Sequence, residues 1–177
     1  MKTLITIVVI VISLTSCAMP VNTYRFIDHN LDSSEWEDTT IFDLKRKHAL
    51  ELPVRLNAEQ RKLVNAIIQV ESGGDDDAVG DNGNAIGCLQ IWKVYWQDAV
   101  ERSKLGGKYE DCYDRNYAIK VFDAYMTRYA KEKWTDPKKF DAEHVARIHN
   151  GGPKGYKKKA TIKYWNKVKK ELKPSDR

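Results

Sequence analysis

The sequence predicts an α+β domain that is mainly helical and contains one small β-hairpin. Two observations favour this class. Apolar residues recur at helical spacing in several segments between residues 57 and 172. One Asn-Gly pair, Asn82-Gly83, lies between short apolar pairs, which is typical of a tight hairpin. The 177 residues suffice for a single domain with an N-terminal extension.

Residues 1–17 predict an export signal rather than part of the fold. Lys2 supplies a positive charge, residues 4–14 are almost wholly apolar, and small residues follow. The apolar run is shorter than the roughly 20 residues that span a bilayer. The end of the signal, Leu14-Thr15-Ser16-Cys17, resembles a bacterial lipoprotein box. This resemblance implies a lipid on Cys17 that binds the membrane; an ordinary secretory signal with a chance cysteine is the alternative.

Residues 18–53 are partly acidic and show no sustained period, so we interpret them as a tether to the domain at 54–177. Ala18 follows Cys17, and the absence of Asp there resembles outer-membrane sorting in Gram-negative bacteria. We therefore expect a periplasmic lipoprotein of the cell envelope. The net charge of +5 suits an acidic polymer, either a cell-wall glycan or a nucleic acid, and selects neither.

Two cysteines, Cys88 and Cys112, remain if Cys17 carries a lipid. Export places them where a disulfide can persist. We slightly favour a bridge between them. Two buried free thiols are the alternative, because the sequence does not give the distance between the two Cα atoms.

The first helix of the domain has clear end signals. Asn57 and Gln60 fit a capping box, apolar residues recur at helical spacing as far as Glu71, and Gly73-Gly74 ends the helix. A hairpin within residues 78–87 follows and would form one wall of a cleft beside Glu71.

The remaining apolar segments predict further helices. We expect Asp114 to cap a long helix and Asp141 to cap another, which Asn150-Gly151-Gly152-Pro153 breaks. The other expected helices start in residues 88–91 and cover residues 95–102 and 161–172.

Glu71 is the strongest candidate for chemistry. A carboxyl against apolar walls has its ionised form disfavoured, so we expect a raised pKa. A protonated carboxyl at the lip of a cleft is the general acid that cleavage of a glycosidic bond requires. A solvated carboxylate at a helix end is the alternative interpretation.

Three segments together resemble the lysozyme-like superfamily, specifically soluble lytic transglycosylases (SLT domains) and goose-type lysozymes. They are residues 70–73, 80–91 and 148–153, in this order. The resemblance covers roughly residues 57–172 and implies a lysozyme-like fold with the hairpin beside the catalytic helix. It also implies action on the glycan strands of peptidoglycan.

The resemblance assigns roles residue by residue. Glu71 matches the catalytic acid, and Ser72 matches its usual neighbour. Gln90 is expected to face the cleft, and Asn150 matches an asparagine that contacts the sugar at the scissile bond. Asp81 matches an aspartate that positions water in goose-type enzymes, although aspartate before Asn-Gly is also ordinary turn chemistry.

Other positions depart from the family pattern. His149 stands where the family usually has tyrosine, and we expect it to assist substrate binding. Trp92 stands where goose-type enzymes have a second acidic residue. Tyr156 lies among lysines beside Asn150, and we count it among the substrate-binding candidates.

The missing acid at Trp92 leads us to favour lytic transglycosylation. The bond cleaved would be the β-1,4 bond between N-acetylmuramic acid and N-acetylglucosamine. By resemblance, Glu71 would act as acid on the leaving oxygen and then as base on the 6-hydroxyl of the muramic acid. A hydrolytic lysozyme that uses Asp81 is one alternative, and a non-catalytic glycan-binding lipoprotein is another.

We expect no metal and no cofactor. Asp75-Asp76-Asp77 lacks the spacing of an EF-hand loop, and His144 and His149 lack the spacing and third partner of a zinc helix. Basic residues among aromatics permit nucleic-acid binding, but export argues against it. We expect a monomer.

Overall fold

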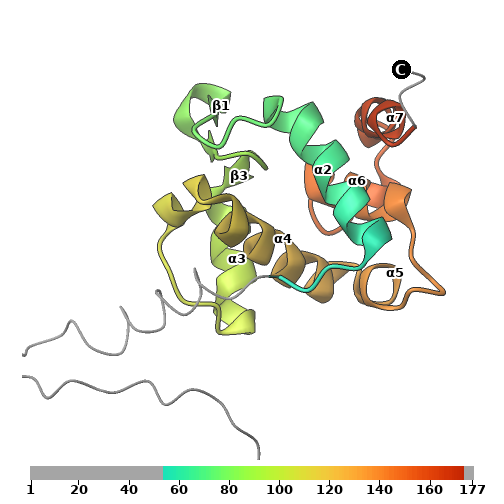
Figure 1. Ribbon diagram of the computed structural model, residues 1–177, viewed down its shortest axis with the longest axis horizontal. Helices are drawn as coiled ribbons and strands as arrows, with labels where there is room; N and C mark the ends of the chain where they lie inside the picture. Colours follow the sequence, from blue (N-terminus) through green and yellow to red (C-terminus); the bar gives the residue numbers. More distant parts are fainter. Residues whose placement is uncertain (1–53, 174–177) are drawn as a thin grey trace, which may run out of the picture. The chain divides into compact units, whose positions relative to one another are not determined.

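The computed structural model describes residues 54–173. The predicted signal, the lipidation site Cys17 and the tether lie outside this range. Helices dominate the described part, and a small sheet lies near the C-terminal end of the first helix, α2 (Figure 1). This architecture confirms the predicted fold class. Within residues 54–173, each helix is too short or too polar to cross a membrane.

The elements follow one another with short connections. The helices are α2 (Ala58–Ser72), α3 (Lys93–Ser103), α4 (Arg115–Tyr129), α5 (Lys131–Thr135), α6 (Ala142–Gly151) and α7 (Thr161–Glu171). The strands are β1 (Val79–Gly80), β2 (Ala85–Ile86) and β3 (Ile91–Trp92). Three 3-10 turns complete the described chain: η1 (Asp81–Gly83), η2 (Tyr109–Tyr113) and η3 (Gly155–Lys157).

Helix α2 begins with the predicted capping box. The Gln60 amide N–H donates to Asn57 Oδ1 (2.9 Å), and the Asn57 N–H donates to Gln60 Oε1 (2.8 Å). The buried Gln60 side chain also donates to the carbonyl of Trp134 (2.8 Å) and so ties this end of α2 to α5. At the other end, Gly73 adopts a left-handed conformation (φ 66°) that closes the helix just after Glu71.

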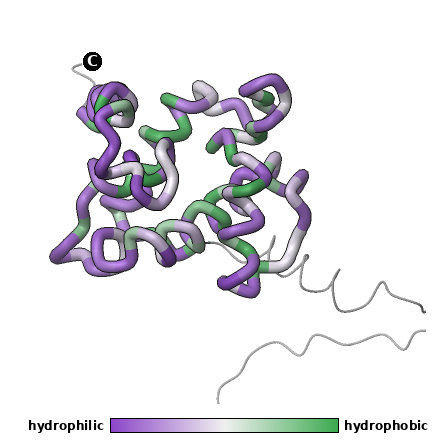
Figure 2. The backbone as a smooth tube through the Cα atoms, turned by 180° about the vertical axis from the view of Figure 1, so that it is seen from behind, coloured by the Kyte–Doolittle hydropathy of each residue, from purple (hydrophilic) through white to green (hydrophobic). Residues whose placement is uncertain are grey.

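The core lies where α2, α4, α6 and α7 pack together. Helix α6 packs against both α4 and α7, and α7 also packs against α2. The largest fully buried side chains include Trp134, Tyr117, Phe122 and Leu63. Figure 2 shows that hydrophilic residues predominate along α7, whose apolar residues Tyr164 and Val168 are buried.

The predicted hairpin is part of a three-stranded antiparallel sheet in the order β1-β2-β3. Val79 pairs with Ile86, and Ile86 pairs with Ile91. The prediction of a helix starting in residues 88–91 is therefore wrong. Positive φ angles at Gly87 (73°) and Gln90 (46°) turn the chain back toward β2, so that Ile91 joins the sheet. A short apolar run does not by itself distinguish a strand from a buried helix segment.

The other predicted helices are present. Asp114 caps α4 by accepting the Tyr117 N–H (2.8 Å), and Asp141 caps α6 by accepting the His144 N–H (3.0 Å). Helix α6 ends at Gly151, within the predicted breaking segment. The five-residue helix α5 was not predicted, because it is too short to show a period, although its Trp134 is fully buried.

The structure contradicts the slightly favoured disulfide. Cys88 and Cys112 are free thiols, and both side chains are fully buried in the core. Burial raises the pKa of the Cys88 thiol to about 12 and that of Cys112 well above its ordinary value. Both residues therefore act as small apolar groups of the core, which was the alternative interpretation.

Gly87 provides a test of the turn that leads into β3. A Cβ built there would lie 2.0 Å from the carbonyl oxygen of Cys112, whereas a Cβ at Gly83 would meet nothing within 4 Å. Both glycines have positive φ, so alanine is strained at either position, but only Gly87→Ala adds a clash with the main chain. We expect Gly83→Ala to destabilise by about 1–2 kcal/mol and Gly87→Ala by about 1–3 kcal/mol more.

Denaturant unfolding of the two variants measures this difference. Equal stabilities would show that the sheet can move away from η2 without cost, which contradicts the close packing described above.

Candidate active site

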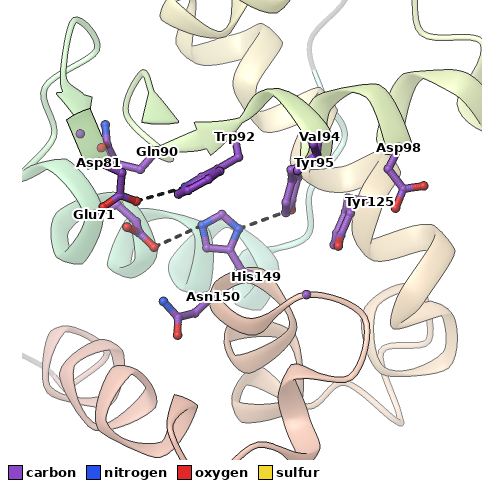
Figure 3. A pocket seen from close by; sticks show the side chains of 12 residues that line it. Glu71, Asp81, Gln90, Trp92, Val94, Tyr95, Asp98, Tyr125, His149 and Asn150 are labelled. Atoms are coloured by element: carbon purple, nitrogen blue, oxygen red, sulfur yellow. Dashed lines mark hydrogen bonds and ion pairs between the residues drawn. The ribbon is translucent and has the colours of Figure 1, made fainter. Parts of the chain in front are cut away.

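A cleft of about 660 Å³ opens between the small sheet and the ends of α2 and α6. This volume is within the usual range for sites that bind small ligands. Figure 3 shows the side chains that line it, with Glu71 and Asp81 near one end and Asp98 at the other. The lining residues are Glu71, Gly80, Asp81, Gln90, Trp92, Val94, Tyr95, Asp98, Tyr125, His149, Asn150 and Gly152.

Glu71 is held by side chains from two other helices. The Tyr164 hydroxyl of α7 donates to Glu71 Oε1 (2.7 Å), and His149 Nε2 of α6 lies 3.4 Å from the same oxygen. The Glu71 side chain is 18% exposed, and that of His149 is 4% exposed. Both contacts involve Oε1, so Oε2 is the oxygen left to face the cleft within the described part of the chain.

The pKa of Glu71 is lowered from its ordinary value of 4.5. Burial is the largest single influence and raises the pKa of Glu71. The hydrogen bond and charge of His149, the Tyr164 hydrogen bond and the charge of Lys167 together outweigh it. The predicted raised pKa is therefore wrong for the free protein. The sequence showed the apolar surroundings of Glu71 but not its hydrogen-bond donors, and Tyr164 is 93 residues away.

His149 lies on the floor of the cleft, and its role in substrate binding stays a prediction. Its ring packs edge-on against Tyr95 (5.6 Å between centroids) and tilted against Phe122 (5.2 Å). Its Nδ1 lies 3.4 Å from the Tyr95 hydroxyl, so the ring connects Glu71 to Tyr95 (Figure 3). Tyr95 in turn stacks on Tyr125 (3.7 Å), which extends this aromatic floor.

Asp81 is a turn residue whose side chain also reaches the cleft. Its main chain forms the turn η1, where its carbonyl accepts from the Asn84 side chain (2.8 Å) and its φ is 47°. Its carboxylate lines the cleft, and Oδ2 accepts a hydrogen bond from Trp92 Nε1 (3.1 Å). The structure therefore brings Asp81 and Glu71 to the same cleft.

Gln90 and Asn150 also line the cleft, as predicted. The Gln90 amide donates to the carbonyls of Ala78 (3.2 Å) and Gly87 (3.0 Å), so it also fastens the turn before β3. A Cβ at Gly80 would lie 2.0 Å from Gln90 Oε1, so a larger residue there would displace the end of the Gln90 side chain.

Two of the predicted substrate-binding residues lie outside the cleft lining. The Ser72 hydroxyl donates to the carbonyl of Cys88 (3.0 Å) and joins the end of α2 to the turn after β2. Tyr156 stacks on His144 (4.2 Å between ring centroids). The sequence placed both near the site because they neighbour Glu71 and Asn150 along the chain, but their side chains have structural partners.

Two residues in or next to the cleft were not assigned to the site from the sequence. Tyr164 is buried in α7, and its hydroxyl reaches Glu71 from there. Asp98 was not singled out; it accepts from the Tyr129 hydroxyl (2.5 Å) and pairs with Arg128. Across residues 54–173, no cluster of three His, Cys, Asp or Glu side chains is arranged to hold a metal ion.

The arrangement is that of a lysozyme-like enzyme: a glutamate at a helix end faces a small sheet across a cleft in a mainly helical domain. A profile of the destabilase family matches residues 60–171, and the chain belongs to this family. The predicted lysozyme-like class is thereby confirmed. The matching family is neither the soluble lytic transglycosylases nor the goose-type lysozymes.

Curated relatives carry the name lysozyme. The chain is 38% identical over 93 residues to a lysozyme of Ostrea edulis, covering 51% of this chain and 64% of the relative. It is 33% identical over 113 residues to a lysozyme of Meretrix lusoria, covering 62% of this chain and 88% of the relative.

The solved structures that are similar to this chain are also lysozymes. The crystal structure of Tapes japonica lysozyme is similar with a TM-score of 0.52 and 33% identity, over 62% of this chain and 88% of that one. Meretrix lusoria lysozyme in complex with Aeromonas hydrophila PliI is similar with a TM-score of 0.51 and 35% identity, over the same shares.

The lowered pKa of Glu71 predicts a pH dependence of stability. A lowered folded-state pKa means that ionised Glu71 stabilises the fold above pH 4.5, and this contribution is lost as the pH falls through the lowered pKa. We expect the stability difference between the wild type and Glu71→Gln to shrink on acidification. Thermal unfolding of both proteins between neutral pH and pH 3 measures it, and a difference that favours the wild type increasingly in acid would indicate a raised pKa.

The Tyr164 hydroxyl should be one cause of that lowered pKa. Tyr164→Phe removes the donor to Glu71 Oε1 and keeps the buried ring, so we expect the pKa of Glu71 to rise. An NMR titration of the Glu71 side-chain carboxyl carbon in both proteins measures the change. Tyr156→Phe serves as the control, because the Tyr156 hydroxyl lies outside the cleft. An unchanged pKa of Glu71 in Tyr164→Phe would show that the Tyr164 hydroxyl does not lower it.

Proposed function

We propose that this protein hydrolyses the β-1,4 bond between N-acetylmuramic acid and N-acetylglucosamine in peptidoglycan. The observation that carries the proposal is the presence of Glu71 and Asp81 in one cleft, on different elements. Two carboxyl groups on either side of a glycosidic bond are the usual machinery of glycoside hydrolysis. The lysozyme names of the relatives and of the similar structures support the same reaction.

Glu71 is the proposed general acid. It is ionised in the free protein because its pKa is lowered, so it needs a proton before it can protonate the leaving oxygen. A bound glycan excludes water from the cleft, and this further desolvation favours the protonated form. Tyr164 and His149 hold Oε1, which leaves Oε2 to approach the glycosidic oxygen.

Asp81 is the proposed partner for water. Its carboxylate is on the sheet side of the cleft and can accept a proton from a water molecule that attacks the sugar. The sequence led us to favour lytic transglycosylation because Trp92 replaces a second acid. Hydrolysis is now the better supported reaction, because Asp81 faces the cleft and the relatives are lysozymes.

A lysine-rich surface beside the cleft suits an acidic wall polymer. Residues 154–173 contain nine lysines and one glutamate, and they cover η3 and α7. Lys167 is near enough to Glu71 to lower its pKa, so this positive surface continues to the site. Such a surface attracts the carboxylates of peptidoglycan to the cleft.

We also propose that the protein acts at the cell envelope. This proposal rests on the sequence of residues 1–53, with a lipid on Cys17 as the anchor and residues 18–53 as the tether. Both features lie outside the described residues.

Digestion of purified peptidoglycan by the full chain, with mass spectrometry of the products, tests the reaction. We expect products with reducing ends. Glu71→Gln should lower the rate about 100-fold or more, because it removes the acid, and Asp81→Asn should lower it by a similar factor. Asp77→Asn, which changes an exposed aspartate outside the cleft, should retain full activity.

Other products would decide against hydrolysis. Products that end in 1,6-anhydro-muramic acid, with activity retained in Asp81→Asn, would indicate a lytic transglycosylase. Binding of glycan without any product would indicate a glycan-binding lipoprotein.

A further inference from the structure

Trp92 is a large aromatic side chain that the fold leaves open to the cleft. It is 45% exposed, whereas the other cleft aromatics, Tyr95 and Tyr125, are mostly buried in the stacked floor. In Figure 3 its ring extends toward Asp81 and lies between Asp81 and Tyr95. The ring therefore forms an accessible part of the cleft lining between Asp81 and Tyr95.

The indole N–H of Trp92 restrains the carboxylate of Asp81. Asp81 belongs to an exposed three-residue turn with left-handed main chain, so its side chain has little packing of its own. Within residues 54–173, Trp92 Nε1 is the side-chain donor that reaches the carboxylate, at 3.1 Å from Oδ2. This bond leaves Oδ1 for a water molecule or a sugar hydroxyl.

The main chain fixes the two partners relative to each other. Trp92 pairs with Ala85 in the sheet and is the N-cap residue of α3, which begins at Lys93. The Tyr109 hydroxyl, with its one proton, lies 2.7 Å from the carbonyl oxygen of Ile91 and 3.0 Å from that of Asn84. Tyr109 thus joins the strand that carries Trp92 to the turn that carries Asp81.

We propose that Trp92 is a positioning residue with two contributions to the reaction. Its N–H orients the Asp81 carboxylate, and its exposed ring provides a flat apolar surface on which a pyranose ring of the glycan stacks. Because tryptophan combines an apolar ring with a hydrogen-bond donor, one side chain serves both tasks. This inference rests on the proposed hydrolysis and gives a role to the residue that stands where goose-type enzymes have a second acid.

Two substitutions of Trp92 separate the two contributions. Trp92→Phe keeps a ring and removes the donor, so we expect kcat on solubilised peptidoglycan to fall about tenfold while KM changes less than about twofold. Trp92→Ala removes the ring as well, so we expect the same loss in kcat and a KM raised about fivefold or more. Val79→Ala, an exposed apolar residue of the same sheet outside the cleft, should change neither constant.

Thermal unfolding of each variant checks that the fold is intact. An intact Trp92→Phe protein with unchanged kcat would overturn the orienting role, and an intact Trp92→Ala protein with unchanged KM would overturn the stacking role.

A double-mutant cycle tests whether the N–H acts through Asp81. In the Asp81→Asn background, we expect Trp92→Phe to cause no further loss of kcat, because the group that it orients is already changed. Full additivity of the two losses would overturn the orienting role.

The cycle also distinguishes the two proposals. If Asp81→Asn lowers kcat and Trp92→Phe does not, the orienting role fails alone. If Asp81→Asn is fully active, the proposed hydrolytic role of Asp81 fails, and the orienting role fails with it.

Discussion

The buried carboxylate of Glu71 is the constraint on which the arrangement of this domain depends. A charged group that is largely removed from water is costly unless donors or opposite charges surround it. Helix α2 supplies the carboxylate, α7 supplies the hydroxyl of Tyr164, and α6 supplies the ring of His149. Three helices therefore meet at one oxygen atom, at the place where α6 and α7 pack against α2. The same contacts leave the second oxygen toward the cleft.

The small sheet forms the opposite wall of the cleft, and its turns hold it in place. Each strand of the sheet is only two residues long, so the turns set the shape of the sheet more than the hydrogen bonds between strands do. Gly87 approaches the main chain of Cys112, Gln90 fastens the turn before β3, and Tyr109 joins β3 to the turn after β1. These contacts hold an exposed carboxylate and an exposed aromatic ring at fixed positions. One wall thus carries a buried, hydrogen-bonded acid, and the other carries an accessible one.

Local signals in the sequence predicted what depends on near neighbours. The caps at Asn57, Asp114 and Asp141 act within three residues, so the helix starts were predicted and found. The position of Glu71 at a helix end beside a hairpin was predicted for the same reason. Strand β3 was missed because its identity depends on pairing with β2, and α5 was missed because it has too few residues to show a period.

Distant contacts decided the features that the sequence predicted wrongly or left open. The sign of the Glu71 pKa shift depends on Tyr164, 93 residues away, and on His149, so apolar neighbours alone suggested the wrong direction. The loss of an acid at Trp92 suggested an enzyme without a water-positioning group. In the structure, Trp92 donates a hydrogen bond to Asp81. This contact exists only because the sheet brings the two residues together, so the sequence alone does not reveal it. The free state of Cys88 and Cys112 likewise depends on packing that the sequence does not contain.

We propose that water, rather than a sugar hydroxyl, attacks the glycan in this cleft. Digestion of peptidoglycan in water enriched in oxygen-18, followed by mass spectrometry of the products, tests it most directly. We expect one heavy oxygen at each newly formed reducing end, provided that the reaction time is too short for the reducing ends to exchange oxygen with water spontaneously. Anhydro products that carry no heavy oxygen would contradict it, because their formation requires no water.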